Sequence, residues 1–263
     1  MAGAALSSAN VISLLSDFGL RDTYVGQMKA AVVAVNPAAR LIDLTHEIGS
    51  GDVREAAFTL EGAWRHFPLG TVHLAVVDPG VGSARLPLAV AAGGHFFVGP
   101  DNGLFTLVLA THPEARLFRL REDFKDEVSA TFHGRDVFAP AAGYLSLGRP
   151  LEELGEPLAA CVRLALPEVR REGGMLWGEV WRVDRFGNLI TNLRREHLGG
   201  RPVAAVAAGG WRGPLRRTYA EAAPGGCLAL WGSAGWLEVA CRGASAAERL
   251  GLASGAPVGV EMA

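Results

Sequence analysis

Lysine, cysteine and long hydrophobic runs are scarce in this sequence. Lys29 and Lys125 are its only lysines, so nearly all of the 25 basic residues are arginines, and 27 acidic residues leave a net charge of -2. This balance argues against the broad basic surface expected of a protein that binds nucleic acid or an anionic membrane. No apolar run reaches the roughly 18 residues of a membrane-spanning helix, and Met1–Asn10 lacks the basic and apolar segments of a signal peptide. We therefore expect neither nucleic acid nor membrane as a partner. The cysteine usage favours a reducing, cytoplasmic location.

The cysteines give no sign of a covalent or metal-bound framework. Cys161, Cys227 and Cys241 are odd in number and form no Cys-x-x-Cys pair, so we expect neither a disulfide framework nor a zinc site. The chain instead has length and apolar content: 263 residues, 49% of them hydrophobic, suffice for one large domain or two modest ones with buried cores.

The first half of the chain alternates apolar runs with helical patterns. Val11–Leu15, Leu41–Leu44 and Val72–Val77 have the pattern of strands, and Tyr24–Val35 and Val53–His66 that of helices between them. This βαβαβ order predicts an α/β domain with a largely parallel central sheet.

A hairpin and a further helix complete this half. Leu88–Ala92 and His95–Val98 flank Gly93 and Gly94, which form a two-residue hairpin signal. Asp136–Leu147 has the pattern of a closing helix.

Beyond about Gly148 the composition changes, with prolines in a connector and Gly-Gly pairs between short apolar runs. This texture predicts a smaller, all-β, barrel-like second domain. We expect its strands at Met175–Val183, Val203–Ala207, Cys227–Leu230 and Trp236–Ala240. We divide the chain into an α/β domain over residues 1–160 and a β domain over residues 161–263.

The stretch Thr71–Arg85 is the most informative in the chain. An apolar run ends in Asp78, a Pro-Gly turn follows, and Arg85 comes shortly after. We expect a buried strand that delivers Asp78 to its end, with Arg85 folded back beside it. Open α/β sheets bind ligands outside the carboxyl ends of their strands. These residues alone fit a structural ion pair equally well.

Three polar residues follow other expected strands. Asp17 ends the first strand, so parallel pairing would bring it to the same edge as Asp78, where a carboxylate can accept hydrogen bonds from sugar hydroxyls. Asp22 precedes a helix, where it could bind an amine or simply favour the helix dipole. Asn102 lies beside Asp101 in a turn where both residue types tolerate left-handed geometry, and that role alone explains them.

His133 precedes a glycine and a charged pair at the start of the closing helix. With Asp78 and Arg85 it would offer a base, a fixed cation and a titratable hydrogen-bond partner. Asp17, Asp78, Asp101 and His133 could in principle converge on Mg²⁺ or Mn²⁺. No helix-spaced histidine pair supports a dedicated metal site, and no Gly-x-Gly-x-x-Gly or Walker lysine supports a nucleotide-phosphate site.

The second half contains one dense polar turn. Asp184, Phe186 and Asn188 fall within it, and an ordinary hairpin tip explains them. A phenyl face flanked by a carboxylate and an amide also suits an aromatic nitrogen base and an ammonium group. Ser233 places a hydroxyl at the start of a strand that contains Glu238, which is either a ligand contact or a buried, paired charge.

Five blocks resemble one family, in the family's order and across nearly the whole chain. They are Ser16–Gly19 with Asp22–Lys29, Val76–Gly82 with Arg85, Gly99–Gly103, Phe132–Asp136 and Asp184–Asn188. The chain resembles the S-adenosyl-L-methionine (SAM) hydroxide adenosyltransferases, relatives of the SAM-dependent fluorinase and chlorinase. The resemblance implies an N-terminal α/β domain, a C-terminal β-barrel domain and a homotrimer with inter-subunit active sites. It also implies that SAM and water give adenosine and L-methionine, with SAM as substrate and neither cofactor nor metal.

The resemblance further implies roles for single residues. Asp78, Arg85 and His133 match the family's set that holds and activates water or hydroxide. The other matches are contacts to substrate: the ribose with Asp17, the methionine amine with Asp22 and Asp184, the adenine with Asn188 and the methionine carboxylate with Ser233. To these we add three candidate substrate contacts: Asn102, Phe186 and Glu238.

Departures from the halogenases point to the nucleophile. Asp78 stands where the halogenases carry a tyrosine, and Gly134 where fluorinase has its halide-pocket serine. A carboxylate beside the reacting carbon would repel halide, whereas it can accept a proton from water. Ala234 replaces an arginine of fluorinase, which weakens the match at Ser233. The alternatives are a SAM-dependent halogenase, a non-catalytic SAM or adenosine sensor, and a metal-dependent phosphoesterase.

Overall fold

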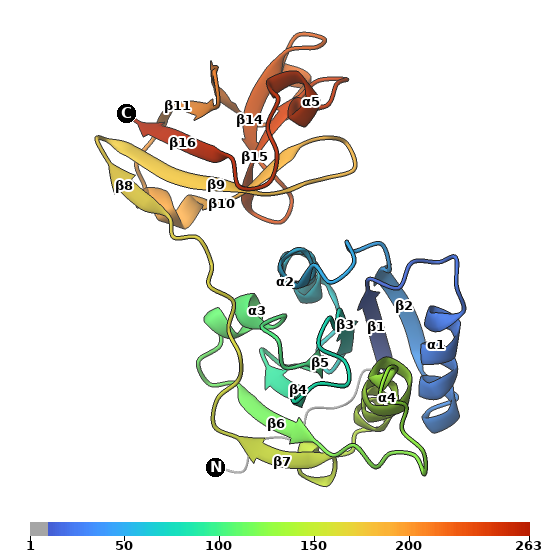
Figure 1. Cartoon of the computed structure of the whole chain (residues 1–263). Helices are drawn as coiled ribbons and strands as arrows, with labels where there is room; N and C mark the ends of the chain where they lie inside the picture. The colour runs from blue at the N-terminus through green and yellow to red at the C-terminus, as the bar shows by residue number, and fades with distance from the viewer. Residues whose placement is uncertain (1–9) are drawn as a thin grey trace. The chain divides into compact units, whose positions relative to one another are not determined.

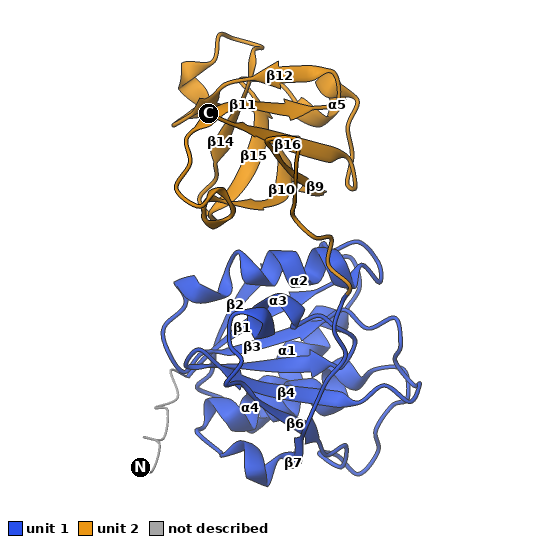
Figure 2. Cartoon of the chain, turned by 90° about the vertical axis from the view of Figure 1, so that its left-hand side faces the viewer, with its two compact units in different colours: residues 1–164 blue, residues 165–263 orange. Residues whose placement is uncertain are grey.

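A computed structural model describes residues 10–263 and divides into two compact units, which meet in sequence at Leu164 and Ala165 (Figure 2). The signal-peptide expectation for Met1–Asn10 falls on residues that, except for Asn10, lie outside those described. Within residues 10–263, no helix is both long enough and apolar enough to cross a membrane.

A seven-stranded sheet in the order β2-β1-β3-β5-β4-β6-β7 is the centre of the first unit (Figure 1). The first four strands in this order run parallel, and β4, β6 and β7 join by antiparallel pairing. The expected α/β architecture and the β4–β5 hairpin are thus confirmed. The strands are β1 (Val11–Ser16), β2 (Arg40–Thr45), β3 (Val72–Val76), β4 (Pro87–Ala92), β5 (His95–Pro100), β6 (Arg116–Leu120) and β7 (Gly155–Leu158).

Helices cover both faces of this sheet (Figure 1). Two of them, α1 and α4, pack together on one face, and α2 and α3 pack together on the other. The α-helices are α1 (Tyr24–Val35), α2 (Val53–Glu61), α3 (Thr106–Ala110) and α4 (Ala139–Ser146), with a π-helical turn at Gly134–Phe138 and 3₁₀ turns at Trp64–His66 and Leu151–Glu153.

Two expected helices have different boundaries in the structure. The helix expected over Val53–His66 ends at Glu61, where Gly62 is the C-cap, and resumes only as a 3₁₀ turn. The closing helix begins earlier than Asp136, because a π-helical turn starts at Gly134.

The central strands read as continuous apolar runs because both of their faces are buried. In β1, Ile12 and Leu14 belong to the cluster beneath α1 and α4, while Leu15 belongs to the cluster beneath α2 and α3. In β3, Val76 and Ala75 divide between the two clusters in the same way. Polar side chains within these strands are therefore buried and paired, as Ser13 Oγ is with His73 Nδ1 at 2.6 Å, and the strand ends are where polar groups can meet a ligand.

The second unit is a nearly closed, barrel-like sheet in the order β12-β11-β16-β9-β10-β15-β14-β13, with β8 paired to β9. Contacts of β11 with β13 and of β12 with β14 bring the two ends of this order together, which confirms the expected all-β domain. Its strands are β8 (Arg170–Glu172), β9 (Met175–Val183), β10 (Leu189–Arg194), β11 (Val203–Ala208), β12 (Trp211–Gly213), β13 (Leu215–Arg216), β14 (Cys227–Trp231), β15 (Trp236–Cys241) and β16 (Pro257–Met262). Helix α5 (Ala246–Leu250) and 3₁₀ turns at Arg195–Leu198 and Tyr219–Glu221 complete it.

A disulfide joins Cys227 to Cys241, so the expectation that the cysteines form no disulfide is wrong. The two residues are register partners in the antiparallel pair β14–β15, with Cα atoms 3.9 Å apart. Cys161 remains as a free thiol. One bonded pair and one free cysteine also give an odd number, so the count alone conceals the bond.

Candidate active site

Asp17 and Asp78 follow neighbouring strands at the same edge of the first sheet, as expected. Strands β1 and β3 are parallel, and their register pairs Ser16 with Val76. The chain therefore leaves the sheet at adjacent points. Asp17 Oδ2 accepts a hydrogen bond from the Gly51 amide at 2.8 Å, which fixes this carboxylate against the loop between β2 and α2.

Arg85 folds back onto Asp78, as the sequence predicted. Its Nε lies 3.0 Å from both carboxylate oxygens of Asp78, and its Nη2 lies 2.5 Å from Oδ2. The two side chains are only 9% and 6% exposed. The turn between them is closed by hydrogen bonds from the Val81 amide to Asp78 O and from the Ser83 amide to Gly80 O. The result is a buried, charge-assisted pair, a strong class of hydrogen bond.

His133 joins this pair through its Nδ1 atom, which lies 2.9 Å from Arg85 Nη2. Arginine has donors but no acceptor, so Nδ1 must accept, and the neutral ring carries its proton on Nε2. Burial, and then the charge of Arg85, lower the pKa of His133 below its ordinary 6.5, which keeps the ring neutral at pH 7. His133 therefore offers an N–H donor rather than a free basic nitrogen.

One side of the Arg85 guanidinium has no protein partner. Nη1 is buried and makes no hydrogen bond to any described residue, and the guanidinium carbon lies 5.1 Å from the centre of the Phe138 ring. Leaving a buried donor unsatisfied costs about 1–3 kcal/mol. An unsatisfied group of this kind calls for a specific explanation, and a ligand is the simplest one here. Arg85, Asp78 and His133 thus present a cationic donor, a carboxylate acceptor and a neutral donor.

A buried carboxylate, Asp136, anchors the segment that carries His133, and the sequence analysis missed it. Asp136 is fully buried and accepts hydrogen bonds from Lys125 Nζ at 2.7 Å, Arg135 Nε at 2.7 Å and the Ser129 amide at 3.0 Å. The Arg135 hydrogen bond, the largest cause, holds the pKa of Asp136 well below its usual range. The adjacent charged residues Arg135 and Asp136 were the sequence signal that could have identified this anchor.

Asn102 supports the strand that carries Asp78. Its Nδ2 donates to Val77 O at 2.8 Å, and its Oδ1 accepts from the Leu104 amide at 3.3 Å. Neither Asn102 nor Asp101 has the left-handed backbone that the sequence allowed; the positive φ of this turn, 95°, falls on Gly103.

The structure does not gather the candidate metal ligands. Asp78 is paired with Arg85, and Asp101 Oδ1 accepts from the Val162 amide at 2.8 Å. Asp22, which was expected as a substrate contact and not as a metal ligand, is exposed and lies two residues before α1. Across residues 10–263, no group of three or more His, Cys, Asp or Glu side chains is arranged to hold a metal ion.

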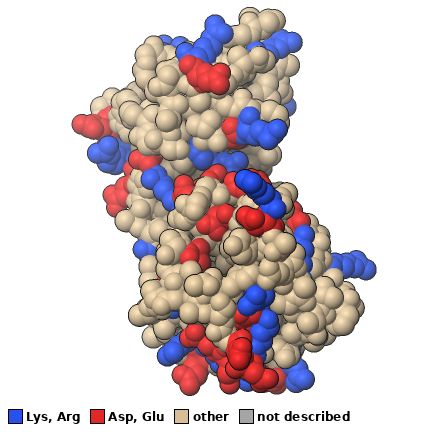
Figure 3. All heavy atoms as spheres, turned by 45° about the vertical axis from the view of Figure 1, so that its right-hand side comes forward, with Lys and Arg blue, Asp and Glu red and all other residues tan. Residues whose placement is uncertain are grey.

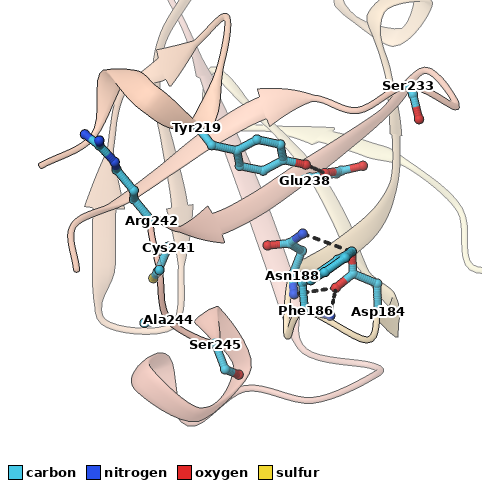
Figure 4. A pocket seen from close by; sticks show the side chains of 11 residues that line it. Asp184, Phe186, Asn188, Tyr219, Ser233, Glu238, Cys241, Arg242, Ala244 and Ser245 are labelled. Atoms are coloured by element: carbon cyan, nitrogen blue, oxygen red, sulfur yellow. Dashed lines mark hydrogen bonds between the residues drawn. The ribbon is translucent and has the colours of Figure 1, made fainter. Parts of the chain in front are cut away.

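The candidate residues of the second unit share one pocket of about 720 Å³ (Figure 4). The β9–β10 turn contributes Asp184, Phe186 and Asn188, while Ser233 comes from the β14–β15 turn and Glu238 from β15. Five predicted residues are thereby brought together. The pocket is also lined by Tyr219, Cys241, Arg242, Gly243, Ala244 and Ser245, none of which the sequence analysis selected as a contact.

Asp184 organises its own turn. Its Oδ1 accepts from the Phe186 and Asn188 amides, and its Oδ2 from Asn188 Nδ2, all at 2.9 Å. Gly187 has a φ of 79°, and a Cβ there would lie 2.2 Å from Ser245 Oγ. This close approach brings the turn against the loop before α5. Phe186, in the same turn, is 78% exposed.

Glu238 is hydrogen-bonded to Tyr219, whose hydroxyl donates to Oε2 at 2.8 Å. Burial is the largest cause that raises the pKa of Glu238. Burial, followed by the bond to Glu238, raises the pKa of Tyr219 to about 12. The Thr218 to Glu221 capping box marks the turn that carries Tyr219 and was the available sequence signal.

Comparison with known proteins matches both units to two halves of one family. Residues 12–155 match the N-terminal domain, and residues 178–259 the C-terminal domain, of SAM hydroxide adenosyltransferase. The chain belongs to the SAM hydroxide adenosyltransferase family. It is 46% identical to the (R)-S-adenosyl-L-methionine hydrolase of Thermus thermophilus, over 94% of this chain and 98% of that protein.

The chain has higher sequence identity to (R)-S-adenosyl-L-methionine hydrolases than to fluorinases. The (R)-S-adenosyl-L-methionine hydrolase of Salinispora tropica is 41% identical over 93% of this chain and 95% of that protein. The fluorinase of Nocardia brasiliensis is more distant, at 29% over 96% and 97%. A solved structure from Thermotoga maritima superposes with a TM-score of 0.89 and 35% identity, covering 95% of this chain and 99% of its own.

The surface of this family member shows no large basic region in the view of Figure 3. On that face, Lys and Arg side chains among the described residues are interspersed with Asp and Glu side chains.

Proposed function

We propose that this protein hydrolyses (R)-S-adenosyl-L-methionine to adenosine and L-methionine, by attack of water or hydroxide on the ribose 5′ carbon. The observation that carries the proposal is the buried group of Asp78, Arg85 and His133, in which Arg85 Nη1 lacks a partner. The curated relatives named (R)-S-adenosyl-L-methionine hydrolase, at 41–46% identity over most of the chain, support the same reaction and its sulfur configuration.

The reaction is a displacement at carbon. The water oxygen forms a bond to C5′ as the C5′–S bond breaks, and the electron pair of that bond stays on sulfur, which becomes the neutral thioether of methionine. The sulfonium needs no protonation to leave. Free hydroxide is scarce at neutral pH because the pKa of water is about 15.7, so the enzyme must supply an oriented oxygen and a proton acceptor.

The three residues divide this work. Arg85 Nη1 donates to the oxygen nucleophile and stabilises hydroxide character on it. His133 donates from Nε2 and orients the oxygen, because its Nδ1 is already engaged by Arg85. The proton therefore goes to Asp78, which has acceptor capacity beyond its bonds to Arg85, and then to solvent.

The carboxylate of Asp78 also selects the nucleophile. Its negative charge disfavours chloride or fluoride at this position and favours water. Hydrolysis is therefore favoured over halogenation, in agreement with the lower sequence identity to fluorinase.

The remaining predicted contacts bind the substrate. Asp17 accepts hydrogen bonds from the ribose hydroxyls, and Phe186 and Asn188 hold the adenine. Fixing the ribose in this way supplies the proximity that in-line displacement requires. Asp22, Asp184 and Ser233 contact the methionine part.

The proposed assembly follows from the family resemblance. We propose a cytoplasmic homotrimer in which the first unit of one subunit meets the second unit of the next. The site needs no metal and no cofactor. Light scattering of the purified protein measures the assembly directly.

One incubation tests the proposed reaction against its rivals. The protein is mixed with each sulfur epimer of SAM, with and without EDTA and chloride, and products are separated by chromatography. We expect equimolar adenosine and methionine from the (R) epimer, unchanged by EDTA. Binding without products would indicate a sensor, chlorinated adenosine a halogenase, and activity lost in EDTA a metal-dependent enzyme; each of these results refutes the proposal.

A further inference from the structure

The pocket of the second unit is lined by two carboxylates and one guanidinium, a formal excess of one negative charge. Asp184 and Glu238 both line it, and after burial the two carboxylates contribute to raising the pKa of Tyr219, which lines the same pocket. Arg242 also lines the pocket, but its Nη1 donates to Ala222 O at 2.9 Å and to Ala220 O at 3.2 Å. No salt bridge within the described chain includes either carboxylate. Burial raises the pKa of Glu238, and the positive charge of Arg182 only partly opposes that rise. Half-buried carboxylates without a paired cation favour a ligand that brings positive charge.

The two carboxylates differ in what they can still accept. A carboxylate offers about four lone-pair sites. Asp184 already accepts three hydrogen bonds from its own turn. Glu238 accepts one, from Tyr219. Glu238 is therefore the carboxylate with the greater capacity to meet a ligand, although the family resemblance draws attention to Asp184.

The backbone around Glu238 is shaped to hold its carboxylate in place. Glu238 lies in the interior of β15, with register partners on both sides, Ile190 in β10 and Leu230 in β14. A Cβ on Gly232 would lie 1.7 Å from Glu238 Oε1, so this position requires glycine while the carboxylate keeps its place. Tyr219 holds the other oxygen (Figure 4). Such preorganisation is typical of a recognition group.

We propose that Glu238 selects a positively charged adenosyl ligand over a neutral one. SAM carries a sulfonium and an ammonium against one carboxylate, a net charge of one positive unit, whereas S-adenosylhomocysteine lacks the sulfonium charge and adenosine is neutral. The proposal rests on the proposed function for the identity of the ligand. It assigns Glu238 a role in substrate choice and in release of the neutral nucleoside product, apart from the chemical step at Asp78.

Isothermal titration calorimetry of the full-length protein tests this role. Affinities for (R)-SAM and for S-adenosylhomocysteine are measured in an Asp78→Asn background, which lacks the proton acceptor and so spares the substrate, with and without Glu238→Gln, which retains an acceptor for Tyr219. We expect Glu238→Gln to weaken the binding of SAM by at least about tenfold while the binding of S-adenosylhomocysteine changes little, because both ligands carry the ammonium but only SAM carries the sulfonium charge. Gly232→Ala, which displaces the carboxylate without removing it, should shift the preference in the same direction.

A matched control separates local charge from net charge. Glu261→Gln removes a carboxylate that pairs with Arg212 away from the pocket, and in the same background it should leave the ratio of the two affinities unchanged. Equal loss of both affinities in Glu238→Gln would mean that Glu238 contacts a group that the two ligands share, the adenosyl part or the ammonium, and two unchanged affinities would mean no contact; either result overturns the proposal. Circular dichroism melts identify variants that fail to fold. If Glu238→Gln does not fold, the ligand preference of Gly232→Ala decides whether Glu238 has the proposed role.

Hydrolysis of SAM by the wild-type protein tests the proposed function separately from the role of Glu238. A wild-type protein that hydrolyses SAM, with the same preference in Glu238→Gln, refutes only the role of Glu238. A wild-type protein that neither hydrolyses nor binds SAM refutes the proposed function, and with it the ligand assumed here.

Discussion

Replacing Arg85 with methionine should separate its two contributions, because Arg85 both neutralises a buried carboxylate and presents Nη1 to the nucleophile. The Asp78 and Arg85 side chains are 6% and 9% exposed, so Arg85→Met leaves Asp78 charged, buried and unpaired. Breaking a buried pair in this way costs about 3–5 kcal/mol. For a unit of this size that loss corresponds to a melting temperature lower by roughly 6–20 °C.

A double-mutant cycle then isolates the ion pair. Asp78→Asn with Arg85→Met removes both charges, and we expect it to recover most of the stability lost in Arg85→Met, because replacing both partners of a buried pair is often nearly neutral. Activity should not recover: each single variant and the double variant should lose about 10²–10³ in turnover, as expected when a preorganised donor or acceptor is removed.

Calorimetric melts and chromatographic assay of adenosine measure the two effects. An Arg85→Met protein as stable as wild type would refute the buried ion pair. Recovery of activity together with stability in the double variant would show that Arg85 only balances the charge of Asp78, and would remove its role toward the nucleophile.

Three further predictions address the histidines and the disulfide. Because burial and the charge of Arg85 lower the pKa of His133 below 6.5, its neutral form persists in mild acid. The acid limb of the pH–rate profile should therefore lie below pH 6.5 and shift to higher pH in Arg85→Met. An acid limb that stays at the same pH in Arg85→Met would contradict the role given to His133. Burial lowers the pKa of His73 to about 3, so below pH 6.5 the unfolded chain binds more protons than the folded protein. As the pH is lowered from 6.5 to 3, the free energy of unfolding should therefore fall by up to about 1.4 kcal/mol per pH unit. His73→Leu with Ser13→Ala should flatten this slope in denaturant titrations. The Cys227–Cys241 bond closes a sequence separation of 14 residues and should contribute about 3 kcal/mol; thiol titration should find one reactive cysteine before reduction and three after, and three before reduction would refute the bond.

Much of the first unit could be predicted from its sequence because its signals are local. The apolar runs at β1 and β3 are long enough to mark strands buried on both faces, and the alternation with helices requires parallel pairing. Parallel pairing of neighbours then brings Asp17 and Asp78 to one edge without further information. The Pro-Gly turn likewise predicted the return of Arg85 to Asp78.

The helix boundaries were harder to predict for a physical reason. The helical pattern in the sequence continues past Glu61 into Trp64–His66, but the regular helix ends at Glu61, with Gly62 as its C-cap. The π-helical turn at Gly134–Phe138 likewise depends on packing rather than on periodicity.

Side-chain partners distant in sequence were decided only by the tertiary structure. His133 meets Arg85 across 48 residues, and that contact, rather than the motif around His133, fixes the ring as a neutral donor. Tyr219 meets Glu238, and Cys227 meets Cys241, because neighbouring strands and turns of the barrel place them together. No local pattern encodes these distances.

The sequence by itself therefore determined the two-unit architecture, the strand-end carboxylates and the arginine that returns to one of them, since each follows from hydrophobic periodicity and turn chemistry within a few residues. Only the tertiary structure decided the hydrogen-bonding roles within the group of Asp78, Arg85 and His133, the lack of a partner for Arg85 Nη1 among the described residues, and the excess negative charge of the pocket that contains Glu238. Those properties depend on burial and on the exact partners of each polar atom, which arise when distant segments pack.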